Sequence, residues 1–246
     1  MNMPSEQELI KLLGGDDFFL WEYYGKGILG KIQAWMFRSR LKVITKFLRQ
    51  AQLQPRAILD VGSGPMFISY VLVNNAISEY IGVDIMHADR LKKYKDAMRN
   101  LGVKKIEAIR ASAESLPLRN ESFDFALSLD VLEHLSKPKE AAMEISRVVK
   151  DDGMVAISLP LENFFQKACR IGFVLMKSTG DSTLKRIKSP SIIRTPEYHY
   201  AGDAKSYDSM AKILKILFKP LITSYTPIGF HKSINVNAIH ILQKNG

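Results

Sequence analysis

Between residues 57 and 160, short apolar segments typical of buried strands alternate with segments of helical spacing, and this alternation constrains the fold more than any other feature. Helices are expected over 66–76, 87–101 and 138–150. Strands that alternate with helices form βαβ units, whose right-handed crossovers give a parallel sheet with helices on both faces. The sequence therefore predicts an α/β fold with a doubly wound, mostly parallel sheet. The expected strands are AILDV (57–61), YIGVDI (80–85), KIEAIRA (105–111), SFDFALSLD (122–130) and MVAISLP (154–160).

The alternation divides the chain into four regions. Residues 1–55 are expected to form an N-terminal helical cap, and residues 56–160 form the core. The pattern loosens over 161–204, which predicts a lid or substrate insertion, because long irregular stretches of compact domains are usually functional. Residues 205–246 resume the alternation and complete the sheet. Outside the core, the expected elements are helices over 28–51, 164–176 and 205–218 and strands near 220–226 and 236–242.

The net charge of +10 is unevenly distributed along the chain. Residues 1–56 carry +4, residues 57–162 carry −3 and residues 163–246 carry +9. A mildly acidic core between two basic flanks suggests an anionic partner for the flanks. The simpler interpretation, that solvated lysines keep the protein soluble, stands beside it.

Cysteine usage and hydropathy indicate the compartment. Cys169 is the only cysteine, so an intrachain disulfide is excluded and a reducing setting is favoured. The first residues show no basic segment followed by an apolar core, and no apolar run reaches the ~18–20 residues that span a bilayer. We therefore expect a cytoplasmic protein that is at most peripheral to a membrane.

The stretch ILDVGSGPM, residues 58–66, places a glycine turn between an expected strand and an expected helix. Ligands of open parallel sheets bind beyond the carboxyl ends of the strands, and glycines let the backbone approach them. The turn lacks the third glycine of a dinucleotide site, and Asp60 just before it would repel a pyrophosphate but suits a cationic ligand. Asp84, twenty residues after Gly64, can accept hydrogen bonds from a ribose diol. A ligand with a ribose and positive charge is S-adenosylmethionine, which carries a sulfonium and an ammonium group.

Four segments in order resemble the class I S-adenosylmethionine-dependent methyltransferases, in the group that includes ubiquinone and menaquinone biosynthesis and other small-molecule enzymes. The resemblance implies a Rossmann-like sheet with an antiparallel last strand, and S-adenosylmethionine as cofactor. The segments are ILDVGSGPM, GVDI (82–85), ASAESLPLRNESFDFALSLDVLEHL (111–135) and VVKDDGMVAISLP (148–160).

The resemblance also implies a role for each position of the motifs. The turn around Asp60 would lie against the methionine part, Asp84 would bind the ribose, and the end of the fourth strand would face the ammonium group and the methyl. Two positions depart from the family pattern: Met66 stands where a glycine is frequent, and Ser112 stands where an aspartate often contacts the adenine amino group, a contact that Glu114 could replace. The implied cofactor-binding residues are Asp60, Gly62, Ser63, Gly64, Asp84, Ile85, Met86, Ser112, Ala113, Glu114, Ser128 and Leu129.

Catalysis by such a domain needs few protein groups, because the cofactor carries the chemistry and the protein orients the reactants. A general base is required only where the accepting oxygen or nitrogen loses a proton. The candidates are His134, His199 and Tyr198, each of which has an alternative interpretation as a structural or surface residue. The five histidines and one cysteine show no metal-ligand spacing, so no metal is expected.

The methyl acceptor is expected to be a small or lipid-like, possibly anionic molecule, because the regions outside the core are basic and apolar. An RNA methyltransferase or a non-catalytic cofactor-binding protein are the alternatives, although no basic motif is interleaved with stacking aromatics. In the helix over 28–51, which lacks acidic residues, we expect Trp35, Met36 and Phe47 to form one buried stripe that closes over the acceptor. The alternative is that this stripe contacts an anionic membrane surface.

Overall fold

The computed structural model describes residues 4–15, 24, 27–73, 78–161, 206–228, 235 and 237–245. The expected helix over 164–176, nearly all of the expected lid, and the candidate bases Tyr198 and His199 lie outside these residues. Of the helices within the described ranges, none combines the length and apolar composition required to cross a membrane.

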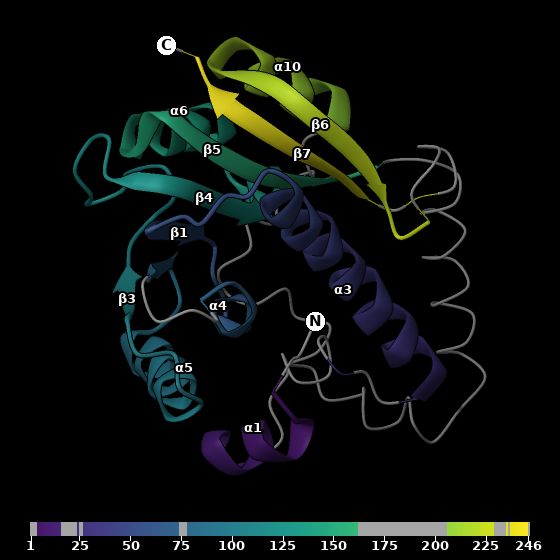
Figure 1. Cartoon of the computed structure of the whole chain (residues 1–246), viewed down its shortest axis with the longest axis vertical. Helices are drawn as coiled ribbons and strands as arrows, with labels where there is room; N and C mark the ends of the chain where they lie inside the picture. The colour runs from purple at the N-terminus through teal and green to yellow at the C-terminus, as the bar shows by residue number, and fades with distance from the viewer. Residues whose placement is uncertain are drawn as a thin grey trace.

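Within the described residues the core is a seven-stranded sheet with the order β3-β2-β1-β4-β5-β7-β6 (Figure 1). The pairs among β1 to β5 are parallel, and β7 is antiparallel to both β5 and β6. This confirms the doubly wound, mostly parallel sheet and the antiparallel last strand. The strands are β1 (Ala57–Val61), β2 (Glu79–Asp84), β3 (Ile106–Arg110), β4 (Phe123–Leu129), β5 (Val149–Pro160), β6 (Phe218–Thr226) and β7 (Asn237–Lys244).

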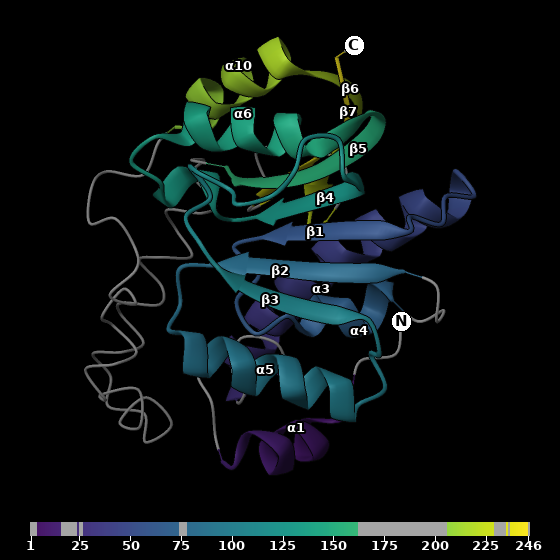
Figure 2. The ribbon, with the colours of Figure 1, turned by 90° about the vertical axis from the view of Figure 1, so that its left-hand side faces the viewer.

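Helices cover both faces of the sheet, as expected (Figure 2). Inward residues of α1, α3, α4 and α5 pack with one set of strand side chains, and those of α6 and α10 pack with the other set. Each face therefore has its own apolar core, because successive side chains of a strand point to opposite sides. The helices are α1 (Glu6–Leu13), α3 (Gly27–Gln50), α4 (Phe67–Leu72), α5 (Ala88–Asn100), α6 (Pro138–Val148) and α10 (Tyr207–Leu217), with a 3₁₀ turn η1 (Leu132–His134).

The strand order reverses at β1, which pairs with β2 on one side and with β4 on the other. The carboxyl ends of β1, β2 and β4 therefore meet at one edge of the sheet, where open α/β sheets bind their ligands. The glycine turn follows β1, Asp84 is the last residue of β2, and Asp130 directly follows β4.

Helix α1 is an element that the sequence analysis did not predict. Ser5 caps it by accepting a hydrogen bond from the backbone N–H of Glu8, while the Glu8 carboxylate accepts one from the Ser5 backbone. Leu9 and Leu13 are buried against the core. The signal was present in the Ser-x-x-Glu spacing before an apolar pair.

The long helix α3 faces the sheet with a stripe different from the one expected. Phe37, Leu41 and Ile44 are buried, whereas Trp35 is 49% exposed. Met36 and Phe47 are half-buried. The expectation of one buried stripe is therefore wrong for Trp35, because this helix is apolar on two sides and only one of them can meet the sheet.

We expect Leu41→Ala to lower the free energy of unfolding by about 2–5 kcal/mol, because the truncation leaves a cavity in a fully buried position. The matched control is Ile32→Ala on the same helix, where the side chain is 45% exposed and the cost should be well under 1 kcal/mol. Urea denaturation followed by circular dichroism measures both. Equal costs for the two variants would contradict the assignment of the inward face.

Candidate functional site at the carboxyl edge of the sheet

The turn after β1 has three residues in the left-handed backbone region. Gly62 has φ +73°, Gly64 has φ +51° and Met66 has φ +56°. At Gly62 a side chain is also excluded by space, since an added Cβ would lie 2.3 Å from Cγ2 of Val131. Met66 adopts a left-handed conformation that costs glycine almost nothing but strains a residue with a Cβ, so the methionine at this position carries backbone strain.

The backbone N–H groups of this turn are satisfied within the protein. Those of Gly62 and Ser63 donate to the Val83 carbonyl at 2.8 and 3.1 Å, and that of Met66 donates to the Ser63 carbonyl at 3.0 Å. The N–H of Gly64 donates to Oδ2 of Asp84 at 2.9 Å. Pro65 has no N–H, so the turn offers no free donor with which to cradle a pyrophosphate.

Asp84 at the end of β2 holds the turn on one side and the following segment on the other. Its Oδ1 accepts the N–H of Met86 at 2.9 Å, in addition to the Gly64 bond at Oδ2. A carboxylate oxygen can accept two hydrogen bonds, so each oxygen retains capacity for a ribose hydroxyl. Because Asp84 is only partly buried, this capacity faces accessible space.

Asp60 lies inside the protein beneath the turn, with 1% of its surface exposed. The Tyr80 hydroxyl donates to its Oδ2. Burial raises the pKa of Asp60 to about 7, and the nearby Asp84 adds to the shift while the Tyr80 bond opposes it. A buried carboxyl poised near neutrality at the switch point of an α/β sheet is typical of a functional position.

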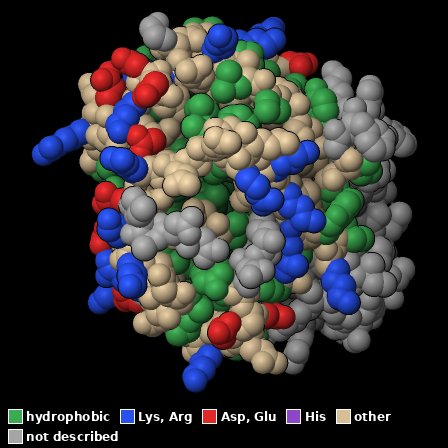
Figure 3. Space-filling view, in the orientation of Figure 1, with side chains coloured by type: hydrophobic (Ala, Val, Ile, Leu, Met, Phe, Trp, Pro, Cys, Tyr) green, Lys and Arg blue, Asp and Glu red, His purple; other side chains and the backbone are tan. Residues whose placement is uncertain are grey.

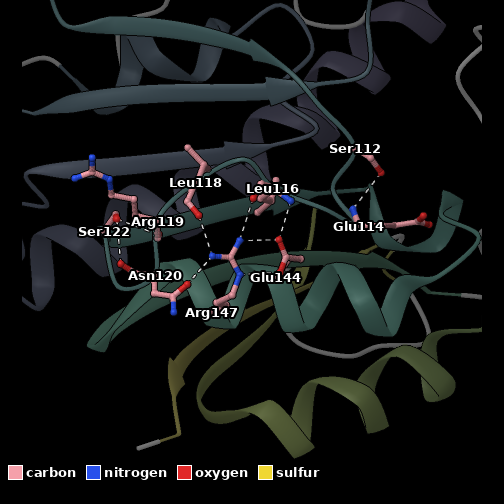
Figure 4. Close-up of polar contacts among 9 residues, drawn as sticks. All are labelled: Ser112, Glu114, Leu116, Leu118, Arg119, Asn120, Ser122, Glu144 and Arg147. Atoms are coloured by element: carbon pink, nitrogen blue, oxygen red, sulfur yellow. Dashed lines mark hydrogen bonds and ion pairs between the residues drawn. The ribbon is translucent and has the colours of Figure 1, made fainter.

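Apolar and hydroxyl side chains lie beside this acid pair. Ile85 is 38% exposed, while Met86 and Ala113 are buried at 4% and 7%. Ile85 therefore offers an exposed apolar surface, backed by buried Met86 and Ala113, on which a planar aromatic ring of a ligand could pack. The Ser112 hydroxyl accepts the N–H of Glu114 at 3.2 Å (Figure 4).

The carboxylate of Glu114 is engaged with the start of α6. Its Oε1 accepts hydrogen bonds from the Ser136 hydroxyl at 2.9 Å and from the N–H of Lys137 at 2.8 Å. These bonds fix the loop that carries Ser112 and Ala113. The role of Glu114 toward an adenine amino group stays a prediction.

A second clamp holds the same loop from α6 (Figure 4). Arg147 pairs with Glu144 through two 2.7 Å contacts and donates to the carbonyls of Leu116 and Leu118 at 3.0 and 2.8 Å. The Glu144 carboxylate in turn accepts the Leu116 N–H at 2.7 Å. The Arg147 guanidinium lowers the pKa of Glu144. A bidentate pair with further backbone bonds is a rigid support, so the segment 112–118 is positioned before any ligand arrives.

At the end of β4, Ser128 is fully buried and Leu129 is half-buried. The hydroxyls of Ser128 and Ser63 are buried and have no hydrogen-bond partner within the described part of the chain. Buried polar atoms normally have partners, so two such hydroxyls on neighbouring segments point to a ligand or to water at this edge.

Asp130, which the sequence analysis did not single out, is the centre of a polar network beyond β4. It has φ +55° and contacts Arg40 of α3 and the Ser158 hydroxyl of β5. The Asn237 amide of β7 donates to its two oxygens at 3.1 and 3.3 Å. The signal that could have revealed this network is Arg40, a basic residue on the inward side of α3 between Phe37 and Ile44.

Glu133 is the second residue that was missed. It is 4% exposed, and its Oε2 has no hydrogen-bond partner among the residues described. Burial raises its pKa to about 7, and the charge of Arg40 opposes the shift. His134 Nε2 lies 3.8 Å from Glu133 Oε1. The structure thus brings His134 together with a buried carboxyl, while Tyr198 and His199 lie outside the described residues.

Comparisons with known proteins agree with this geometry. Residues 59–157 match the family model described as a methyltransferase domain. An uncharacterized methyltransferase of Mycobacteroides abscessus is 31% identical over 126 residues, which are 49% of this chain and 47% of the relative. Residues 59–157 therefore form a methyltransferase domain.

Solved structures extend the similarity in fold to nearly the whole chain. The methyltransferase domain superposes with a TM-score of 0.58 on 1,6-didemethyltoxoflavin-N1-methyltransferase of Burkholderia thailandensis, at 14% identity and covering 100% of this chain and 93% of the other. The cyclase SpnF gives a TM-score of 0.62 at 15% identity, covering 97% and 93%. Identities this low show the fold alone, and the chain spans about half the length of the curated relatives that it matches.

In the ligand-free wild-type protein, Asp60 should make the free energy of unfolding fall as the pH rises. We expect Asp60→Asn to abolish this dependence. The folded state holds a proton on Asp60 up to about pH 7, whereas the unfolded chain releases it near 3.8, so wild-type stability from this group falls as the pH rises from about 4 to 7. The variant should therefore gain melting temperature relative to wild type between pH 5 and pH 8, since each pKa unit corresponds to about 1.4 kcal/mol. Thermal unfolding measures the difference in melting temperature between Asp60→Asn and wild type at each pH. A difference that stays constant from pH 5 to pH 8 would show that Asp60 is ionised in the folded protein.

Proposed function

We propose that the protein transfers a methyl group from S-adenosylmethionine to a small-molecule acceptor. The observation that carries the proposal is the turn after β1, whose N–H groups are all used internally and whose neighbouring acid, Asp60, is buried. Such a turn is unsuited to a pyrophosphate and suited to a nucleoside with a cationic tail. The methyltransferase family of residues 59–157 supports the same conclusion.

The residues present fit the cofactor in three places. Asp60 would balance the positive charge of the methionine part, and the free hydroxyls of Ser63 and Ser128 could bind its polar groups. Asp84 would accept the ribose hydroxyls with its remaining lone pairs. We further propose that the adenine packs on Ile85 and Met86, beside the loop that carries Ser112, Ala113 and Glu114.

For methyl transfer the protein must align the acceptor with the methyl group, exclude water and, for some acceptors, accept a proton. The bound cofactor supplies an electrophilic methyl on a sulfonium. The rigid support of the 112–118 loop and the Asp130 network would hold the two sides of the site in fixed positions, which is how alignment lowers a barrier. Where the acceptor loses a proton, Glu133 is better placed to receive it than His134 alone, because its carboxyl is buried and poised near pH 7.

Charged groups on the inner side of the site support a proposal about the charge of the acceptor. Arg40, the inward-facing basic residue of α3, is already paired with Asp130. Glu133 adds a further carboxyl close by. The described residues therefore favour a neutral or cationic acceptor over the anionic one suggested by net charge, and the positive charge of α3 lies on its outer face.

Isothermal titration with S-adenosylhomocysteine should give binding that NAD does not compete. Asp84→Ala should weaken it by roughly ten- to hundredfold, since a hydrogen bond to a charged group contributes about 1.5–3 kcal/mol. The same change removes two backbone bonds of the turn, so a loss of about 1–3 kcal/mol in stability is also expected. Glu79→Ala, at the exposed opposite end of the same strand, is the matched control and should leave affinity unchanged. Tight binding of NAD without binding of S-adenosylhomocysteine would overturn the assignment.

Methyl transfer itself is tested by S-adenosylhomocysteine release across a panel of phenols, amines and carboxylates. Turnover with a neutral or amine acceptor is expected, and Glu133→Gln should lower kcat by about 10²–10⁴-fold for acceptors that lose a proton. Cofactor binding should be retained in this variant. A protein that binds the cofactor and turns over with none of the acceptor classes would favour a non-catalytic role.

A further inference from the structure

The outward face of α3 combines exposed apolar side chains with positive charge only. Ile32 and Trp35 are 45% and 49% exposed and lie one turn apart on the helix. Exposure of large apolar side chains to water is unfavourable in free energy. A pair of such side chains on one helix face therefore indicates a surface that a partner could cover.

The charges on this helix all have one sign. Between Lys26 and Arg56 the sequence contains eight basic residues and no acidic one. Lys31, Lys42, Lys46 and Arg49 are exposed, and Lys and Arg side chains gather over α3 on the face shown in Figure 3. A 100° step per residue places these four within the same outward arc as Trp35.

Strand β6 extends the surface beyond the helix. It contacts α3 and is an edge strand of the sheet within the described residues. Its register shifts between Pro220 and Ile222, so the consecutive residues Leu221 and Ile222 are both exposed, at 39% and 42%. Lys219 beside them is exposed as well. Thus β6 has the same combination of apolar and basic side chains as α3.

We propose that α3 and β6 form a docking surface for an anionic lipid bilayer. Basic residues attract anionic headgroups, and tryptophan is the residue that most favours the boundary between headgroups and acyl chains. The occupant is a bilayer rather than a folded protein because the surface is positively charged along its length and has only a few exposed apolar side chains. It is a bilayer rather than RNA because Trp35 is the only exposed aromatic residue of large size among those described, whereas single strands bind on several stacking rings.

The proposal is independent of the cofactor assignment, because the residues of this surface are not those of the carboxyl edge. The inward face of the same helix holds Arg40 against Asp130, so a bilayer on the outward face would leave that contact in place. Lipid binding and cofactor binding can therefore be measured separately on each variant.

Sedimentation with phosphatidylcholine vesicles, with and without phosphatidylserine, tests the surface. We expect binding that requires phosphatidylserine and weakens as salt increases. Lys42→Glu with Lys46→Glu should lower the partition coefficient by about 20-fold or more, since each basic residue near an anionic surface contributes about fivefold. Trp35→Ala should lower it by about five- to tenfold at constant salt.

The matched control is Lys92→Glu with Lys93→Glu, which makes the same change in net charge on exposed residues of α5, away from the surface (Figure 1). This variant should bind vesicles within about twofold of wild type. Circular dichroism and S-adenosylhomocysteine affinity should be unchanged in all three variants, which separates loss of docking from loss of fold. Equal losses in both double variants, or no preference for phosphatidylserine, would overturn the proposal. The proposal would also be overturned if the protein bound a single-stranded RNA oligonucleotide but did not bind the vesicles.

Discussion

The carboxylate of Asp84 holds the end of β2 and the glycine turn of β1 in one arrangement. One oxygen accepts the N–H of Gly64 and the other that of Met86, while the Val83 carbonyl accepts the N–H groups of Gly62 and Ser63. The turn can curve this tightly because three of its residues have positive φ and because Val131 fills the space that a side chain at Gly62 would need. These bonds leave no backbone N–H of the turn free to bind a phosphate. The turn therefore disfavours a phosphate ligand both by lacking free donors and by the buried carboxyl of Asp60 beneath it.

A second constraint joins the N-terminal helix to the site. Arg40 reaches from α3 to Asp130 beyond β4, and Ser158 and Asn237 bring β5 and β7 into the same network. Arg40 is buried whereas Asp130 is partly exposed, so loss of the Asp130 carboxylate would leave a buried guanidinium without its counter-charge. Helix α3 is thus tied to the segment that follows β4, so a substitution in either element is expected to alter the position of the other.

The alternation of strands and helices made the fold predictable, and the four motifs predict where the cofactor would bind. Asp84 was found because its distance from the glycine turn is set by one βα unit. The inward face of α3 was not found, because Trp35 and Met36 continue one apolar stripe while Phe37, Leu41 and Ile44 form another, and periodicity does not say which meets the sheet. Asp130 and Glu133 were missed for a related reason. Their importance depends on Arg40, ninety residues earlier in the chain, and on burial that no local pattern reveals.

Positions in the fold account for the uneven charge along the chain. The acidic residues Asp60, Asp84, Asp130 and Glu133 of the middle segment gather at the carboxyl edge of the sheet, where we propose that a cationic cofactor binds. The exposed basic residues of α3, Lys31, Lys42, Lys46 and Arg49, lie on its outer side, whereas Arg40 turns inward to meet an acid. One helix therefore separates two electrostatic environments, a negative interior edge and a positive exterior surface. A molecule attracted to the outside need not resemble the ligand of the inner edge, so net charge alone does not determine the charge of the methyl acceptor.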